Sequence, residues 1–583
     1  MFSKSDEPIS ITWLFRYLRP LRFQLFILLL LLLISTVLLL ANPQIVKQFI
    51  DTAAENGLVS GLLTLAGIYL AIAVINQLIT VAISYIGNDV SWKATNHLRG
   101  DLLKHTLRLD MRFHNLKTPG EMIERVDGDV TSMSNFFAMF IVKVIGSFVL
   151  LVGILGLMFT INWPIAIAMS LFTFVSLLAM VYTRNLGVNS TKEERAASAS
   201  LFGFIEERIA GIEDVQTNGS VPYVMNRFHR AMRTVMLKSR RAWMLRIVPW
   251  NVTVVMYTLA VTVILMMGVG YYISGGITLG TLYLIYQYTQ MLNDPIEELG
   301  DQIQEFQKAK SGLLRSRELL SITSDIRDGA IDRLPDGPLS LAFNHVNFSY
   351  NKDQQVLKDI HFTLKPGEKL GVIGRTGSGK SSMSRVLLRL YNIDSGSIHI
   401  GGIDIRELKL DALYRRVGMV TQDVQLFDGT LRDNLTLFNK ELADEYILAT
   451  TAKLGLRKWI DAQPNGLDTH VSSGGSSLSA GEAQLFALSR VFLTQPSLVI
   501  LDEPSPRLDA ATEAMLQEAV NQLLNQCTGI IIAHRLATLE KVDTIMVLGE
   551  GCILEYGSRA ELASNPNSHY ATLLRIGNEE ELA

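Results

Sequence analysis

Long apolar stretches constrain this chain more than any other feature of its sequence. The run LFILLLLLLISTVLLLA, beginning at Leu25, has no polar side that a helix could turn towards water. A helix needs roughly 20 apolar residues to cross the hydrocarbon core of a bilayer, and six segments are predicted to be long enough. They are Phe23–Ile45, Leu58–Ile86, Phe136–Phe159, Trp163–Thr183, Ile247–Ile273 and Thr278–Met291. The sequence therefore predicts a membrane domain of six helices.

The predicted loops between these segments differ in charge. Those after the first, third and fifth segments, DTAAENG, INW and SGG, contain no Lys or Arg. The two long loops are basic, with Lys93, Arg112 and Arg125 in the first and Arg184 and Arg195 in the second. Positive residues stay on the cytoplasmic side of a membrane. We therefore expect a multi-pass protein of the cell membrane, with both long loops, both termini and the C-terminal half in the cytoplasm.

The cytoplasmic side of the membrane half has two further features. The stretch ITWLFRYLRPLR, beginning at Ile11, is typical of an amphipathic helix on the inner membrane surface. The long inner loops are helical in pattern, too long for connectors, and are expected to extend spans two to five into the cytoplasm. Their candidate tips, near Phe113 and Gly211, would either press on a soluble domain or form solvated charged turns.

Ionisable residues are nearly absent from the predicted spans. Lys143 is the exception, and its place near the inner end of the third span favours snorkelling to the interface over a functional intramembrane charge. A carrier driven by protons or sodium needs titratable or ion-coordinating groups at mid-membrane. The sequence therefore indicates a different source of energy.

Charge and cysteine usage exclude other classes of protein. The formal net charge is -3, whereas binding nucleic acid requires clustered Lys and Arg, so no nucleic-acid partner is expected. The two cysteines, Cys527 and Cys552, are too few for a disulfide framework or a Cys/His metal site, and we expect inert thiols. The N-terminus shows no short apolar stretch with a small-residue cleavage site, so removal of a signal peptide is not expected.

The C-terminal half contains a motif that supplies energy. The stretch KLGVIGRTGSGKSS places a glycine-rich loop between a β-rich run, Lys369–Ile373, and a helical pattern. In such a loop, backbone N–H groups surround the β- and γ-phosphates and the helix N-terminus adds its dipole. Lys380 would neutralise phosphate charge, and the Ser381 hydroxyl would reach Mg²⁺. The predicted nucleotide-binding residues here are Gly374, Arg375, Thr376, Gly377, Ser378, Gly379, Lys380, Ser381 and Ser382. ATP and Mg²⁺ are the expected cofactors.

Two adjacent carboxylates suit the same chemistry. The apolar run SLVIL reads as a buried strand, and it ends in Asp502 and Glu503. Asp502 can hold the shell of Mg²⁺, and Glu503 can polarise an attacking water. Without the glycine-rich loop, an ordinary strand end with solvated acids would be the better interpretation. With it, Glu503 becomes the candidate catalytic carboxylate.

Further motifs follow in an order typical of one family. They are Tyr350 in FNHVNFSY, Gln422 in GMVTQD, the stretch LSAGEAQ from Leu478, Asp509 in SPRLD and His534 in IIIAHRL. Over nearly its whole length the chain resembles a half-transporter of the ATP-binding cassette (ABC) superfamily, of the exporter type (type IV). The resemblance implies a multidomain fold: a six-helix all-α transmembrane domain at residues 1–320, a linker at 321–337, and an α/β P-loop nucleotide-binding domain with a helical subdomain at 338–583.

The resemblance also implies roles for individual residues. Tyr350 would stack on adenine, and Gln422 would lie between Mg²⁺ and the membrane domain as a metal ligand beside Ser381 and Asp502. His534 would act as the γ-phosphate switch next to catalytic Glu503. Asp509 would lie in the loop that crosses the dimer interface. In this family the signature acts on the partner's ATP, so the working unit would be a dimer with two sandwiched ATP molecules.

The signature differs from the usual LSGGQ of the family. Ser479 and Gly481 are kept, whereas Ala480 adds a methyl group and Glu482 puts a carboxylate where an amide is usual. The changed residues are those that would contact the partner's ATP, while the residues that would bind this chain's own ATP are intact. A heterodimer with a second half-transporter is therefore favoured. The alternatives are a homodimer that tolerates the changes and an ATP-gated channel or regulator.

The substrate is the least determined property. The fifth and sixth spans are rich in aromatic and Met side chains: Tyr257, Met266, Met267, Tyr283, Tyr286, Tyr288 and Met291. Such side chains could line an adaptable cavity for an amphipathic drug, lipid or peptide. They could equally face membrane lipid or pack against neighbouring helices.

Overall fold

The chain folds into two compact units. The computed structural model describes residues 17–55, 58–183, 186–351, 354–421, 424–472, 480–502, 510–533 and 539–581. One unit comprises Met1–Leu107 and Pro119–Ile322, and the other Arg108–Thr118 and Thr323–Ala583. The short segment 108–118 interrupts the first unit in the sequence but belongs to the second unit. The division predicted at residue 320 did not include it.

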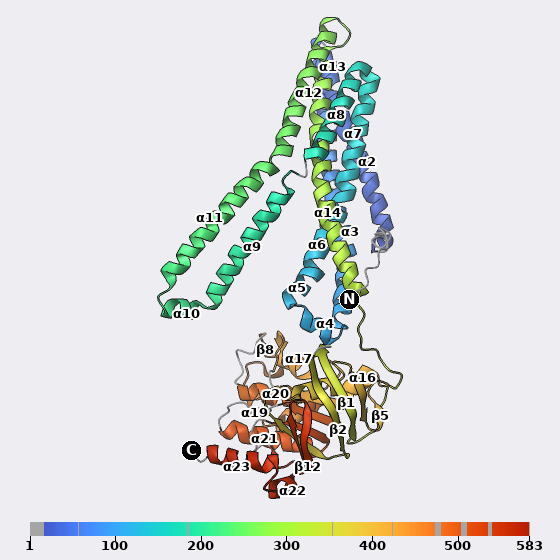
Figure 1. Cartoon of the computed structure of the whole chain (residues 1–583). Helices are drawn as coiled ribbons and strands as arrows, with labels where there is room; N and C mark the ends of the chain where they lie inside the picture. Colours follow the sequence, from blue (N-terminus) through green and yellow to red (C-terminus); the bar gives the residue numbers. More distant parts are fainter. Residues whose placement is uncertain are drawn as a thin grey trace. The chain divides into compact units, whose positions relative to one another are not determined.

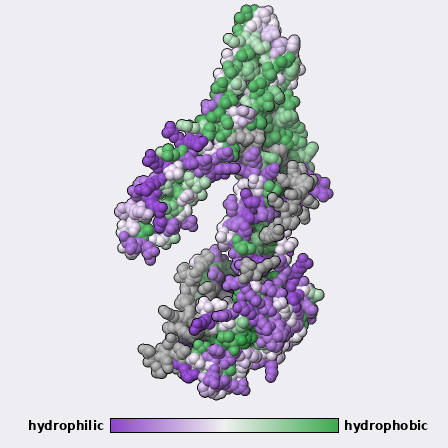
Figure 2. All heavy atoms as spheres, in the orientation of Figure 1, coloured by the Kyte–Doolittle hydropathy of each residue, from purple (hydrophilic) through white to green (hydrophobic). Residues whose placement is uncertain are grey.

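The described residues of the first unit form helices and short connecting turns, and no strand (Figure 1). On the face shown in Figure 2, hydrophobic residues gather over the bundle that contains α8 and α12, while the arm formed by α9 and α11 is mostly hydrophilic. The helices are η1 (Arg19–Leu21), α2 (Arg22–Ala54), α3 (Val59–Leu107), α5 (Pro119–Ile123), η2 (Glu124–Gly128), α6 (Asp129–Met139), η3 (Phe140–Ile145), α7 (Gly146–Ile161), α8 (Trp163–Thr183), α9 (Val188–Ala210), α10 (Ile212–Thr217), α11 (Val221–Arg246), α12 (Val248–Ile273), α13 (Leu279–Met291) and α14 (Asn293–Ser321).

Within the described residues, five helices are long and apolar enough to cross a membrane: Arg19–Ala54, Val59–Leu107, Val142–Ile161, Trp163–Thr183 and Val221–Ile273. The sixth predicted segment, Thr278–Met291, does form a helix, α13, but this has 13 residues and is about 20 Å long. That is shorter than a bilayer core of about 30 Å. The helix is interrupted at Leu292 and continues as α14, because Pro295 has no N–H to donate to the preceding turn. The helix α13 thus matches the predicted bounds Thr278–Met291, but by itself it is shorter than the roughly 20 residues of a spanning helix.

The long inner loops are continuations of the spans, as predicted. The helix α3 has 49 residues, about 74 Å at 1.5 Å per residue, more than twice the thickness of a bilayer core. The helices α9 and α11 run side by side and are joined by α10 (Figure 1). Glu194 on α9 accepts hydrogen bonds from Ser239 (2.7 Å) and Arg246 (2.6 Å) on α11, which fixes the two arms against each other. Of the amphipathic segment predicted from Ile11, only the end from Tyr17 lies within the described residues.

Lys143 has a partner that the sequence analysis did not name. Its Nζ lies 3.1 Å from Oε1 of Glu298 on α14, and Ser147 Oγ donates to Glu298 Oε2 at 3.0 Å. A second ion pair joins α14 to α6: Arg315 on α14 donates to the carboxylate of Asp129, which is 2% exposed. The carboxylate of Glu298 lies beyond the predicted sixth span, so a search of the spans alone could not find it.

The second unit contains two main sheets. Its central sheet has the order β12-β11-β3-β10-β9-β6, in which β12 is antiparallel to β11 and the other neighbours are parallel. An antiparallel sheet has the order β2-β1-β4-β5, and β7 pairs with β8. The strands are β1 (Leu341–Asn351), β2 (Gln354–Leu364), β3 (Lys369–Gly374), β4 (Ser395–Ile400), β5 (Ile403–Asp404), β6 (Val417–Val420), β7 (Gly429–Thr430), β8 (His470–Val471), β9 (Leu498–Asp502), β10 (Thr528–Ile532), β11 (Thr544–Gly549) and β12 (Cys552–Ser558).

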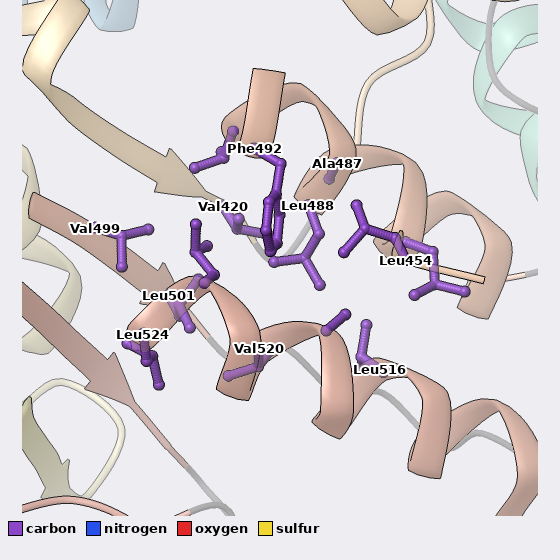
Figure 3. Packing of buried hydrophobic residues seen from close by; sticks show 14 of the residues in the cluster. Val420, Leu454, Ala487, Leu488, Phe492, Val499, Leu501, Leu516, Val520 and Leu524 are labelled. Atoms are coloured by element: carbon purple, nitrogen blue, oxygen red, sulfur yellow. The ribbon is translucent and has the colours of Figure 1, made fainter. Parts of the chain in front are cut away.

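Alternate residues of the central strands face two different cores. Leu498 and Ile500 of β9 pack on the side of the antiparallel sheet, whereas Val499 and Leu501 pack against helices on the other side. Figure 3 shows Leu488 of α20 in that second cluster. The helices of this unit are α4 (Met111–Leu116), α15 (Lys380–Leu387), α16 (Leu410–Arg416), α17 (Leu431–Thr436), α18 (Asp444–Lys453), α19 (Arg457–Asp461), η4 (Gly466–Asp468), α20 (Ala480–Thr494), α21 (Ala510–Leu524), α22 (Arg559–Ser564) and α23 (His569–Glu581). The helices α17 to α19 pack with α20 and form the helical subdomain.

The segment predicted as a linker, 321–337, is packed against the second unit from Thr323 onwards. Ile331 forms a parallel bridge with Leu408. The buried Arg389 donates to the carbonyl oxygens of Arg327 (2.6 Å) and Leu408 (3.1 Å). Gly329 lies close to the chain around Leu408, and a Cβ added to it would stand 2.0 Å from the carbonyl oxygen of Glu407. The chain that leaves α14 is therefore fixed to the soluble unit rather than free.

Candidate functional site

The glycine-rich loop lies where the sequence predicted it, between β3 and α15. Its glycines are required by close approach and by backbone conformation. A Cβ on Gly374 would lie 2.3 Å from the carbonyl oxygen of Leu548, and Gly379, the N-cap of α15, has φ +105°. Only glycine adopts that conformation without strain. The loop therefore turns sharply enough to leave its backbone N–H groups and the N-terminus of α15 available to a phosphate.

Two side chains of the loop fit an anionic ligand. The ammonium of Lys380, which is 6% exposed, folds back over the loop and donates to the carbonyl oxygens of Gly374 (2.6 Å) and Arg375 (3.2 Å). Ser378 Oγ is buried and has no hydrogen-bond partner among the described residues. A buried hydroxyl normally has a partner. The loop thus contains a buried cation and an unsatisfied hydroxyl, which suits a triphosphate.

The central sheet brings Asp502 to the same edge as this loop. Asp502 is the last residue of β9 and pairs with Ile532 of β10, which in turn pairs with Val372 of β3. Neighbouring strands lie about 4.8 Å apart, so Asp502 ends two strands, or about 10 Å, from the strand that leads into the loop. Ligands of parallel α/β sheets bind outside the carboxyl ends of the strands. A carboxylate and a phosphate-binding loop therefore face one edge.

Tyr350 lies beside α15. Its hydroxyl is 3.1 Å from Ser382 Oγ and accepts a hydrogen bond from Arg385 at 3.1 Å. Its ring is partly exposed and meets the rings of Phe348 and Tyr391 edge to face, with centroid distances of 4.8 and 5.0 Å. The aromatic side chain predicted to stack on adenine is therefore next to the helix that follows the phosphate-binding loop.

The altered signature stands at the start of α20. Ala480 and Gly481 are the first two residues of this helix, and Glu482 is the acidic residue of its first turn. The helix is anchored by apolar side chains: Figure 3 shows Leu488 and Phe492 in one cluster with Val499 and Leu501 of β9. A carboxylate in a first turn is favoured by the helix dipole, typically by 0.3–1 kcal/mol. Glu482 therefore stabilises the helix start and adds negative charge there.

Five predicted site residues lie outside the described residues: Gln422, Ser479, Glu503, Asp509 and His534. Their neighbours in sequence are described at three points. Val420 ends β6, Asp502 ends β9, and Ile532 ends β10. All three strands end at the carboxyl edge of the central sheet, where β10 lies between β3 and β9. These described strand ends therefore lie on the same edge of the sheet as the phosphate-binding loop.

Sequence reasoning missed the residues that surround Tyr350. Tyr391, Arg385 and Asn115 contact it directly or through one neighbour, and Asn115 comes from the segment 108–118. Burial is the main cause that raises the pKa of the Tyr391 hydroxyl. The sequence also gave no signal for Arg490 of α20, which donates to the carbonyl oxygens of Gln425 (2.9 Å) and Asn434 (2.8 Å). These contacts join segments far apart in sequence.

The membrane unit contains a small cavity among α8, α12, α13 and α14. Its volume is about 20 Å³, and its lining includes Met169, Phe172, Thr253, Tyr257 and Asn293. A cavity of this size holds about one water molecule. Pockets for drug-sized ligands are usually about 300–1,000 Å³. This cavity is therefore too small to hold a transported compound.

A bundle of membrane helices joined to a soluble α/β unit with a phosphate-binding loop defines a membrane-embedded, nucleotide-driven ATPase. The chain belongs to the ABC transporter family. Residues 25–296 match the family's transmembrane region, and residues 357–506 match the ABC transporter family itself. The chain is an ABC exporter half-transporter, a multi-pass membrane protein whose ATPase activity is coupled to transport.

Three known proteins illustrate the relationship. The chain is 30% identical over 478 residues to a fatty acid ABC transporter ATP-binding/permease protein of Mycobacterium bovis, covering 82% of this chain and 76% of that one. It is 27% identical over 509 residues to an ATP-dependent lipid A-core flippase of Alcanivorax borkumensis, covering 85% of each. The structure of a bacterial Atm1-family ABC exporter with ATP bound has the same fold, with a TM-score of 0.77 and 22% identity over 95% of this chain and 98% of that chain.

Proposed function

We propose that this chain is the ATP-hydrolysing half of a heterodimeric exporter for a hydrophobic or amphipathic substrate. One observation carries the proposal. The edge proposed to bind the chain's own nucleotide has a well-formed phosphate-binding loop and Asp502 two strands away, whereas the helix proposed to face a partner, α20, has Glu482 in its first turn. The two halves of the nucleotide machinery thus differ in charge. Such a difference is expected when the two ATP sites of a dimer are unequal.

In the hydrolytic site, each residue has a separate task. The loop 374–382 and Lys380 hold the triphosphate, and Tyr350 stacks on the base. Mg²⁺, when bound, neutralises charge that develops on the transferred phosphoryl group. Ser381, Asp502 and Gln422 would hold it. Glu503 accepts a proton from the attacking water. His534 contacts the γ-phosphate, and this contact is lost after hydrolysis.

The second site would turn over slowly or not at all. A helix N-terminus attracts a phosphate through its partial positive charge. At α20 the carboxylate of Glu482 already offsets part of that charge. Two negative groups near one helix end disfavour each other, and Ala480 adds a methyl group next to Ser479. The partner's ATP would therefore be held here without efficient closure, while Asp509 contacts the partner across the dimer.

The substrate is proposed to be an amphipathic compound, such as a lipid, a drug or a hydrophobic peptide. The name of one relative refers to a fatty acid, and the name of another refers to lipid A-core. The cavity among α8, α12, α13 and α14 is far too small for such a molecule. A substrate cavity would instead form between the two half-transporters. Closure of the ATP sandwich would draw the inner loops together and turn that cavity outward.

The test is reconstitution of the chain with its co-purifying partner in proteoliposomes. ATP-dependent movement of a fluorescent fatty acid or phospholipid analogue is measured beside the ATPase rate. Lys380→Ala should stop both, whereas Lys358→Ala, an exposed lysine on β2, should change neither. ATP-dependent ion current in a planar bilayer without substrate movement would favour the gated channel. A fully active transporter made of this chain alone would contradict the heterodimer.

A further inference from the structure

Tyr391 is a second aromatic residue at the adenine end of the nucleotide site. It lies four residues beyond α15 and is 5% exposed. Its ring meets that of Tyr350 at a centroid distance of 5.0 Å and an interplanar angle of 87°. Phe348 contacts both rings, at 4.8 Å from Tyr350 and 5.7 Å from Tyr391. The tilt of the Tyr350 ring is therefore set by two neighbours, of which Tyr391 belongs to a different element.

The hydroxyl of Tyr391 contacts α4 rather than the proposed nucleotide site. Asn115, near the end of this helix, donates a hydrogen bond from Nδ2 to the Tyr391 hydroxyl. The other end of α4 is also fixed. Asp110 caps the helix by accepting from the backbone N–H of Phe113 (3.1 Å), and it also accepts from the backbone N–H of Asp325 (2.9 Å). Because α4 is the tip of the first long inner loop, Tyr391 touches a segment that continues into the membrane unit.

On its other side, Tyr350 is joined to the helix of the phosphate-binding loop. Its hydroxyl contacts Ser382 and Arg385 of α15, both at 3.1 Å. Tyr350 thus stands between α15 and Tyr391. A continuous series of contacts runs from the helix that holds phosphate, through two tyrosines, to the tip of an inner loop.

Packing alone does not explain the hydroxyl of Tyr391. A phenylalanine would fill the same space and keep the ring contacts. Burial of a hydroxyl costs free energy unless it is hydrogen-bonded, and here desolvation is the main cause that raises the pKa of Tyr391. Asp110, of α4, and Arg385, of α15, are the charged groups whose fields reach this hydroxyl, with opposite effects on its pKa. The hydroxyl is therefore placed for contact with α4 rather than for filling the core.

We propose that Tyr391 is a positioning residue: through its hydrogen bond with Asn115 it ties the orientation of the Tyr350 ring, and hence the fit of the nucleotide base, to the tip of the first inner loop. The inference rests on the proposed role of Tyr350 in stacking on adenine. Movement of the inner loop would then change the affinity for the base of ATP. Binding of the base would in turn bias the position of the loop, because coupling between two sites is reciprocal.

The experiment uses the full chain with its partner in nanodiscs and measures displacement of a fluorescent ATP analogue by ATP and by inorganic tripolyphosphate. Tyr391→Phe and Asn115→Ala each remove one partner of the same hydrogen bond. Each should weaken ATP binding by about two- to tenfold, the range for one hydrogen bond. The double variant should show no larger loss than the single ones. Tripolyphosphate, which has no base, should compete as well as in the unmodified protein.

Asn392→Ala is the matched control, since the amide of this adjacent residue donates to the carbonyl oxygen of Asp325 at 2.8 Å instead. It should leave ATP binding within twofold. Multiplied losses in the double variant, or an equal loss of tripolyphosphate competition, would overturn the proposal, because either result indicates a general structural effect. Unchanged ATP affinity in both single variants would overturn it as well. If Tyr350→Ala leaves ATP affinity unchanged, the stacking role fails first, and that outcome is distinguishable from failure of Tyr391 alone.

Discussion

The helices α15 and α20 both begin next to a nucleotide-binding motif, yet different charges stand at their first turns. At α15 the first residue is Lys380, whose ammonium lies over the carbonyl oxygens of the preceding loop. At α20 the third residue is Glu482. The dipole of either helix favours an anion at its N-terminus. At α15 no acidic side chain stands in the first turn, so the dipole can act on an anionic ligand. At α20 the carboxylate of Glu482 already offsets part of the dipole. We therefore expect the N-terminus of α20 to attract phosphate less strongly than that of α15.

The largest expected effect concerns the site in which the phosphate-binding loop before α15 holds the chain's own ATP. Glu503→Gln should lower the ATPase rate of the assembled transporter by about 10²- to 10⁴-fold while ATP still binds, because only the group that takes the proton from water is lost. Rates and ATP binding are measured on the same preparation. Glu518→Gln, an exposed change on α21, is the control and should have little effect. Substantial turnover in Glu503→Gln would move catalysis to the partner's site.

The next effect concerns the base of the nucleotide. Tyr350→Ala should weaken ATP binding by about 5- to 150-fold, since stacking a base on an aromatic ring is worth about 1–3 kcal/mol. Tyr350→Phe keeps the ring and should lose far less. Affinities can be read from isothermal titration of the purified transporter. Equal losses in the two variants would show that the hydroxyl contacts with α15, not stacking, matter here.

A smaller effect is expected on the side offered to the partner. Ser479→Ala should reduce turnover only about two- to tenfold, the range for one hydrogen bond, because this signature closes the slower site. The equivalent serine of the partner chain closes the site around Glu503, and its replacement should silence hydrolysis. Steady-state ATPase of the two variants gives the comparison. If both changes cause the same loss, the two sites are equal.

The smallest effect is expected from restoring the usual signature. Ala480→Gly combined with Glu482→Gln should change turnover less than about twofold in a heterodimer, because the rate is carried by the other site. In a homodimer both sites contain this signature beside Glu503, so a shift well beyond the roughly twofold scale of one weak hydrogen bond is expected. The ATPase rate is measured together with subunit composition. A large shift with a single type of chain would establish the homodimer.

Much of the fold could be predicted because its signals are local. The apolar runs give helices wherever no polar face exists, and the glycine-rich loop needs only the residues from Lys369 to Ser382 to be recognised. Asp502 was likewise predicted from the buried strand before it, and β9 ends there. The sixth segment was predicted from its apolar run and forms α13, whereas its continuation as α14 after the interruption at Leu292 was not predicted, because α14 is largely polar.

Other features could not be predicted, because they depend on partners far away in sequence. The ion pair of Lys143 could not be predicted, since its partner, Glu298, lies on α14 beyond the apolar run. The linker prediction did not anticipate that Arg389 would hold Arg327. Neither pairing leaves a trace in local composition or periodicity.

The sequence by itself determined what kind of protein this is. Hydrophobic length dictates membrane helices, and a phosphate-binding loop dictates its own conformation, because both are properties of short stretches and their solvent. Only the tertiary structure decided which segments meet. It joined residues 108–118 to the soluble unit, set Asp502 two strands from β3, and placed Asn115 against Tyr391. Such contacts depend on the packing of whole elements against one another, in which each position is fixed by many distant neighbours at once.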